Sequence, residues 1–264
     1  MKSTINILLV LILFFVFGCT NENEVQSTNA DIPKLKYVEH ISLRDTLQQS
    51  YYYNEDGMLQ VINEYSRFRN STYILSYTNN RVMRYGNNEV SYTTSGQIVT
   101  VKNFANYNDP ERLLVTLKEY TYNSSGKIST IKKTFSDEYK AQLPEEQLAY
   151  LDEWEDIYTW ENNNIKKIIF NSRGKFYAEI TYEYDNSINY QAIVPVVLKN
   201  GAQLSENNVT LTTTRYAFGG ADPPCFSCPS ILEYDEKGHV IKINKPNEGF
   251  GGPFPDIKNI TYID

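Results

Sequence analysis

The stretch KEYTYNSSGKISTI, residues 118 to 131, decides the fold. Polar and apolar residues alternate on both sides of a short polar run, with Tyr120 and Tyr122 before it and Gly126 and Ile128 after it. Alternation with a period of two is typical of β-strands that bury one face. Because a two-residue turn followed by a left-handed glycine reverses an antiparallel pair, this stretch predicts a β-hairpin.

The same spacing recurs along the chain. Each copy has an aromatic residue, three further residues, a glycine, one variable residue, and then an apolar residue. The predicted turn glycines are Gly57, Gly96, Gly126, Gly174 and Gly238. In four copies the residue after the aromatic one can accept a hydrogen bond from the turn backbone; these residues are Asn54, Thr93, Asn123 and Asp235.

Hairpins laid end to end predict an all-β, antiparallel meander that forms a large twisted sheet or an open barrel. A single domain is expected over residues 34–264, with strands that include Ile193 to Leu198. Residues 144–154 change to a helical period and predict one short helical insertion. Six of the ten prolines lie between Pro223 and Pro255, so residues 217–256 are expected to be rich in loops.

The repeat resembles the tyrosine-aspartate (YD) hairpins of Rhs-type and teneurin-type proteins, which build large β-sheet shells. The dipeptide itself stands at Tyr184-Asp185 and Tyr234-Asp235, and other copies carry Asn or Thr in its second position. The segment from Tyr182 to Asn208 is similar to one common in Bacteroidetes lipoproteins of this repeat type. The resemblance implies a fold, and sugar binding has been suggested for such repeats.

The amino terminus predicts export. Lys2 precedes an apolar run over residues 7–17 that is too short to cross a bilayer and is typical of a signal peptide. The sequence Val16-Phe17-Gly18-Cys19 resembles the lipobox of bacterial lipoproteins, which implies that residues 1–18 are removed and that Cys19 carries palmitate-type acyl chains. A simple secreted protein with Cys19 as a free thiol is the alternative.

Residues 19–33 contain no aromatic side chain and few aliphatic ones, so they predict a flexible tether between lipid and domain. The expected location is the outer membrane, with the protein held by its amino-terminal lipid. The acidic stretch Asn21 to Glu24 resembles a surface-export signal of Bacteroidetes lipoproteins. The sequence leaves open whether the domain faces the periplasm or the cell surface.

Composition excludes one class of partner. After loss of Lys2, 24 basic residues remain against 32 acidic ones, a formal charge of −8, and the basic residues are scattered. Binding to nucleic acid depends on clustered Lys and Arg, so no nucleic-acid partner is expected. The 22 tyrosines against 2 tryptophans favour a strand-rich protein.

Cys225 and Cys228 frame the sequence CFSC between Pro224 and Pro229. This spacing occurs in thioredoxin-like redox centres, where a helix start activates the thiol. The surrounding prolines and the absence of a βαβ pattern favour a structural disulfide between the two cysteines. A zinc site is a third reading, which needs further ligands such as His40 and His239.

No motif of a common enzyme class occurs, so no catalytic residue, metal or cofactor is predicted. The acidic run over residues 152–156 is expected to be a solvated helix end. The leading hypothesis is a non-enzymatic envelope module that presents a tyrosine-rich surface to a glycan or an envelope protein. Two alternatives stay open: an envelope hydrolase or thiol redox enzyme that uses Cys225 and Cys228, and a structural accessory of an outer-membrane complex.

Overall fold

The computed structural model describes residues 33–42, 45–105, 111–217, 225–247 and 254–263. The signal segment, Cys19 and most of the predicted tether therefore lie outside the described residues. Within the described ranges, no helix has the length and apolar character required to cross a lipid bilayer.

The described chain is almost entirely β-structure, with two four-residue helices and two 3-10 turns. Its strands are β1 (Leu35–Ile41), β2 (Thr46–Tyr53), β3 (Leu59–Tyr65), β4 (Asn70–Thr78), β5 (Arg81–Tyr85), β6 (Asn88–Tyr92), β7 (Ile98–Ala105), β8 (Leu113–Tyr122), β9 (Ile128–Phe135), β10 (Trp154–Glu161), β11 (Asn164–Ser172), β12 (Lys175–Ile188), β13 (Asn207–Tyr216), β14 (Cys225–Pro229), β15 (Ile231–Tyr234), β16 (Val240–Asn247) and β17 (Phe254–Tyr262). The helical pieces are α1 (Asp137–Lys140), α2 (Glu145–Leu148), η1 (Val196–Leu198) and η2 (Gly201–Leu204).

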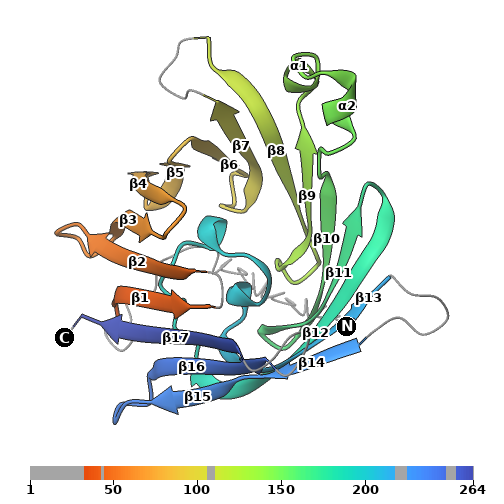
Figure 1. Ribbon diagram of the computed structural model, residues 1–264. Helices are drawn as coiled ribbons and strands as arrows, with labels where there is room; N and C mark the ends of the chain where they lie inside the picture. The colour runs from red at the N-terminus through yellow and green to blue at the C-terminus, as the bar shows by residue number, and fades with distance from the viewer. Residues whose placement is uncertain (1–32, 43–44, 106–110, 218–224, 248–253, 264) are drawn as a thin grey trace, which may run out of the picture.

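The strands form an antiparallel meander that closes on itself. Each strand pairs with the next from β1 to β14, and β15 to β17 continue the series. The closure joins β17 to β1, where Ile260 lies opposite Val38. Only Ser230 separates β14 from β15, so this one extended stretch carries the sheet from β13 to β16. The prediction of an all-β hairpin meander is confirmed as a nearly closed barrel (Figure 1).

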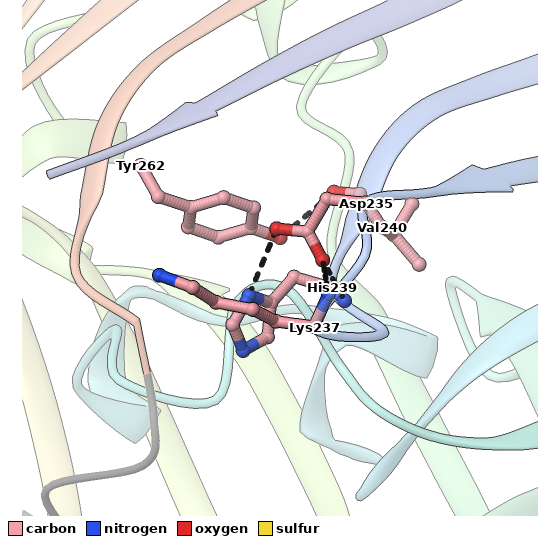
Figure 2. A network of polar contacts seen from close by, with 5 residues as sticks. All are labelled: Asp235, Lys237, His239, Val240 and Tyr262. Atoms are coloured by element: carbon pink, nitrogen blue, oxygen red, sulfur yellow. Dashed lines mark hydrogen bonds and ion pairs between the residues drawn. The ribbon is translucent and has the colours of Figure 1, made fainter. Parts of the chain in front are cut away.

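The turns explain the repeat. Gly57, Gly96, Gly126 and Gly238 all have positive φ, between +76° and +97°, which glycine adopts without a steric penalty. The preceding Asn, Thr or Asp accepts a hydrogen bond from the backbone N–H that follows the glycine, as predicted. Figure 2 shows one example, in which the Asp235 carboxylate accepts from the backbone of Lys237 and His239 and contacts the His239 ring.

Aromatic residues at the ends of several hairpins tie each of these hairpins to a neighbouring one. In six places a Tyr hydroxyl or Trp indole donates to the carbonyl of the aliphatic residue that follows the preceding turn. The pairs are Tyr77 to Leu59, Tyr92 to Val82, Tyr122 to Ile98, Trp160 to Ile128, Tyr184 to Ile165 and Tyr262 to Val240, at 2.6 to 3.0 Å. All six acceptor residues are at most 5% exposed. The aromatic residue before a turn and the aliphatic residue after a turn therefore both contribute to the interior of the barrel. We call these contacts the rungs.

Removal of one rung is expected to weaken the fold measurably. Tyr262→Phe deletes the hydroxyl that donates to Val240 at 2.8 Å, and should lower the free energy of unfolding by about 1 kcal/mol. Tyr52→Phe is the matched control because Tyr52 is 53% exposed and points outward. Denaturant titration of both variants measures the difference; equal midpoints would show that the rung contributes nothing.

The Gly174 turn differs from the other four. Arg173 and Gly174 both have positive φ, and Ser172 pairs directly with Lys175, so this is a two-residue hairpin without the bulge. Because alternate turns of an antiparallel meander lie at the same end, the Gly174 turn lies at the end opposite the other four. Phe176 after it is 46% exposed and does not serve as a buried rung acceptor.

Two predicted elements take other forms. The expected helix over residues 144–154 is limited to α2, and Trp154 already begins β10, because the segment has no buried apolar stripe to extend it. The expected strand from Ile193 to Leu198 is wrong: Pro195 introduces the 3-10 turn η1, and Val194 and Val197 are buried among strands from around the barrel. In residues 217–256, which were expected to be rich in loops around the Tyr234 hairpin, the structure has that hairpin as β15 and β16, and it adds β14 and the start of β17.

Candidate functional site

The two ends of the barrel differ. The turns at Gly57, Gly96, Gly126 and Gly238 lie at one end, which we call the turn end. The connection between β12 and β13, residues 189–206, also leaves the sheet at this end and folds back inside the ring of strands (Figure 1). We call residues 189–206 the inner segment. It fills the turn end and leaves a cavity between itself and the far end.

Buried polar contacts hold the inner segment where it leaves and rejoins the sheet. The Asn208 amide oxygen accepts from the Tyr190 backbone at 3.1 Å, and its nitrogen donates to the Ile188 carbonyl at 3.1 Å and to Asp185 at 3.3 Å. The Ser205 hydroxyl accepts from the Ile165 backbone at 2.9 Å. Since Asn208 is only 2% exposed, these bonds have no competition from water and position the segment firmly.

The cavity has a volume of about 760 Å³. Its wall comes from β1 to β8 and from β17, and its floor comes from the inner segment. Arg69 in the β3–β4 turn and Gly86 in the β5–β6 turn place its rim at the far end. This volume falls within the range of about 300 to 1,000 Å³ that is typical of small-molecule sites.

Most of the lining is polar but uncharged. Amide side chains line the cavity from the wall and the floor, and several tyrosines stand between them. The amides are Gln49, Asn87, Asn88, Asn103, Gln191, Asn200 and Gln203, and the tyrosines are Tyr51, Tyr73, Tyr85 and Tyr190. Part of this set is bonded internally: Asn103 donates to Asn88 at 3.1 Å, and the Tyr51 hydroxyl donates to Gln49 at 3.0 Å.

One floor residue carries an unused acceptor. Gln191 is 9% exposed, and its Oε1 atom has no hydrogen-bond partner among the described residues. A buried amide oxygen without a partner destabilises the protein by about 1 to 3 kcal/mol, so such atoms are rare. Gln191 lines the cavity, but its Oε1 atom is closed off from the cavity space, so the amide would have to rotate before this oxygen could accept from a ligand hydroxyl.

Charged groups of the lining are mostly basic. Arg69, Lys118, Lys258 and His40 line the cavity together with a single carboxylate, Glu64. Glu64 accepts a hydrogen bond from the Gln49 amide at 2.6 Å. His40 lies 2.5 Å from Asp256, and this contact holds the pKa of the Asp256 carboxyl below its usual range.

A buried carboxyl lies on the inward face of β10 and interacts with Lys118 of the cavity lining. Asp156 on β10 is 8% exposed, and burial raises its pKa to about 7 although the Tyr158 hydroxyl and the Lys118 charge both oppose that rise. Burial, with Lys133 nearby, lowers the pKa of Lys118. Asp156 belongs to the run expected to be a solvated helix end; the structure corrects that expectation, because Trp154, Asp156 and Tyr158 alternate on the inward face of a strand.

The predicted site residues do not come together. Cys225 and Cys228 lie on β14, His239 lies in the Gly238 turn, and His40 alone reaches the cavity. Cys228 carries a free, half-buried thiol, and the Cys225 side chain is outside the described residues. Three residues of extended strand separate alpha carbons by about 10 Å, whereas disulfides join alpha carbons about 4.4 to 6.8 Å apart. The disulfide stays a prediction and would require β14 to bend.

The cavity itself was not predicted, although alternation holds part of the signal. Side chains two residues apart on a strand point to the same face. Lys118 is therefore on the face of Tyr120 and Tyr122, and His40 is on the face of the buried Val38, so both belong to inward faces. Motif tyrosines such as Tyr122 and Tyr184 turn their hydroxyls inward as rungs instead of presenting them on an outer surface. The exposed tyrosines are Tyr52, Tyr65, Tyr150, Tyr177 and Tyr234.

Comparison with known proteins gives a fold likeness. No protein-family model and no curated protein matches the chain. The structure is similar to a porin-like protein from Bacteroides uniformis, with a TM-score of 0.54 and 12% identity over 86% of this chain and 96% of that one. A porin-like protein from Bacteroides vulgatus gives 0.49 and 10% over 88% and 99%. A chain of TcdB2-TccC3-TEV gives 0.34 and 10% over 83% and 10%.

Proposed function

We propose that this chain is a lipid-anchored, non-enzymatic protein of the cell envelope that binds a saccharide in its interior cavity. The carrying observation is the cavity of about 760 Å³, which is lined mostly by amide and tyrosine side chains. Sugar hydroxyls both donate and accept hydrogen bonds, so they match a lining of amides and tyrosine hydroxyls. Tyrosine rings also offer apolar faces on which a sugar ring can stack.

An envelope location is supported by three observations. The amino terminus has the features of a lipoprotein signal that ends at Cys19. The fold is shared with a porin-like Bacteroides protein. Outward residues of the sheet carry charged pairs, such as Lys242 with Glu233 at 2.7 Å and Lys167 with Glu179 at 3.2 Å. Such charges are costly against hydrocarbon, which favours a domain that stands in water beside the outer membrane, held by its lipid.

The binding proposal predicts a site-specific loss. The chain, purified from membranes in detergent, should bind members of a glycan array, and calorimetry on the best of these should give a dissociation constant for comparison. Gln191→Leu should weaken that binding at least tenfold, because the substitution replaces a polar amide of the cavity floor with an apolar side chain. Mass spectrometry of the same preparation checks acylation of Cys19.

Gln60→Leu is the matched control, since Gln60 is exposed on β3 and lies outside the cavity. It should bind as the unaltered chain does. A folded protein that binds no saccharide, or equal losses for the two leucine variants, would contradict the proposal.

A further inference from the structure

The charge of the cavity is opposite to that of the protein. The chain carries a formal net charge of −7, yet the cavity lining includes three fixed cations, Arg69, Lys118 and Lys258, against one carboxylate, Glu64. Among the described residues, none of the three cations forms an ion pair within 4 Å. The lining therefore holds positive charge that the protein does not neutralise by direct contact.

Each cation is held by its surroundings with its charge available. The Arg69 guanidinium donates to the Tyr73 hydroxyl at 2.6 Å and to the Ser71 hydroxyl at 2.7 Å, which fixes its position at the rim. Lys118 lies with its ammonium 5.7 Å from the centre of the Trp154 ring. Lys258 on β17 pairs across the sheet with His40, so the two side chains leave the same face.

The nearby carboxylates are already engaged. Asp256 contacts His40 at 2.5 Å, and Glu64 accepts from Gln49 at 2.6 Å. Asp156 is buried on β10 outside the cavity lining and accepts from the Tyr158 hydroxyl at 3.2 Å, and its charge also attracts Lys118. An anionic group that enters the cavity would therefore meet donors at Lys118, Lys258 and Arg69 without displacing an internal ion pair.

We propose that the ligand is an anionic saccharide, a sugar chain that bears carboxylate groups, which the cavity selects over its neutral counterpart. This inference rests on the proposed saccharide function and narrows it to a substrate class. In this proposal the amide side chains, Gln191 among them, bind sugar hydroxyls, and the lysines distinguish an acidic sugar from its neutral counterpart. In a partly desolvated cavity, charge-assisted hydrogen bonds are stronger than neutral ones, so acidic groups gain more than hydroxyls do.

The test compares two probes of equal size, digalacturonate and galactobiose, by calorimetry on the full chain in detergent. Digalacturonate is expected to bind at least tenfold more tightly at low ionic strength, and added salt should reduce this advantage. Lys118→Gln and Lys258→Gln should each remove most of the preference while galactobiose binding stays within twofold. Lys36→Gln is the control, since Lys36 is exposed on β1 and lies outside the cavity.

The outcomes separate the two proposals. Equal affinity for the two probes, or tighter binding of galactobiose, overturns the charge inference and leaves saccharide binding intact. Binding of neither probe, nor of any glycan on the array, overturns both. A preference for digalacturonate that survives both lysine substitutions also overturns the inference, because the cations would then not be its source.

Discussion

Asn208→Ala is expected to lower the free energy of unfolding by about 3 to 5 kcal/mol, among the largest effects of any polar substitution in this chain. Asn208, on β13, is 2% exposed, and its side chain bonds to β12 and to the start of the inner segment. Alanine would leave the Tyr190 N–H and the Ile188 carbonyl without their 3.1 Å partners. Each buried group left unsatisfied costs about 1 to 3 kcal/mol, and the lost contact to Asp185 adds to this.

The loss of stability in Asn208→Ala should appear first as local opening of the inner segment, before the whole barrel unfolds. Backbone amides of the inner segment bond within it, as Ala192 does to the Asn189 carbonyl at 2.8 Å and Val194 does to Gln191 at 3.0 Å. In Asn208→Ala these amides should exchange with deuterium much faster, while those of the β8–β9 hairpin keep their protection. Denaturant titration gives the global stability, and hydrogen exchange gives the local one.

Glu206→Ala is the matched control for this variant. Glu206 lies two residues away and its side chain is exposed, so its removal should change stability by no more than about 0.5 kcal/mol. If Asn208→Ala unfolds at the same denaturant concentration as Glu206→Ala, the inner segment is held by other contacts, and the role given to Asn208 is wrong.

The hairpins could be predicted because their causes are local. Glycine at positive φ and an acceptor side chain three residues before it lie within one turn, so the spacing from Asn123 to Gly126 is visible in the sequence. The rungs use the same two positions of the repeat but join different repeats. The two residues of a rung, such as Tyr122 and Ile98, are 24 residues apart, and neither residue type indicates which residue it will contact.

The cavity could not be predicted because it depends on contacts distant in sequence. Closure pairs Val38 with Ile260, and the floor is formed by residues 189–206. Val194 and Val197 are apolar in a short run, which fits a buried strand as well as a buried turn, and Pro195 was the signal against a strand. Without the closure of the barrel and the position of the inner segment, the sequence cannot show that Lys118 and Gln191 line the same cavity.

Asp156 shows the opposite case, in which a signal was present in the sequence. The acids from Asp152 to Asp156 suggest solvent exposure, yet Asp156 has the same parity as the aromatic residues Trp154, Tyr158 and Trp160, as expected of one inward strand face. The alternation of strand positions therefore predicted the burial of Asp156 better than the charge of the segment did. A buried carboxyl without an ion pair follows, and with it a testable dependence of stability on pH.

The contribution of Asp156 to the stability of the chain is expected to fall as pH rises from about 4 to about 7. The Asp156 pKa is about 7 in the folded protein, against 3.8 for an ordinary aspartate, so in this window the folded state binds more protons than the unfolded state. Stability then decreases with rising pH. Above pH 7 the charged carboxyl is buried in the folded state, at a cost of about 2 to 4 kcal/mol.

Asp156→Asn removes this titration and keeps an acceptor for the Tyr158 hydroxyl, which donates to Asp156 at 3.2 Å. At pH 8 the variant should be about 2 to 4 kcal/mol more stable than the unaltered chain, and near pH 4 the two should agree closely. Asp152→Asn is the control, because Asp152 is exposed four residues earlier. Other titrating groups cancel in the difference between variants, so denaturant titration at pH 4, 6 and 8 isolates Asp156. A difference that does not grow with pH, or one matched by Asp152→Asn, would mean that the attraction of Lys118 offsets the burial of the charge.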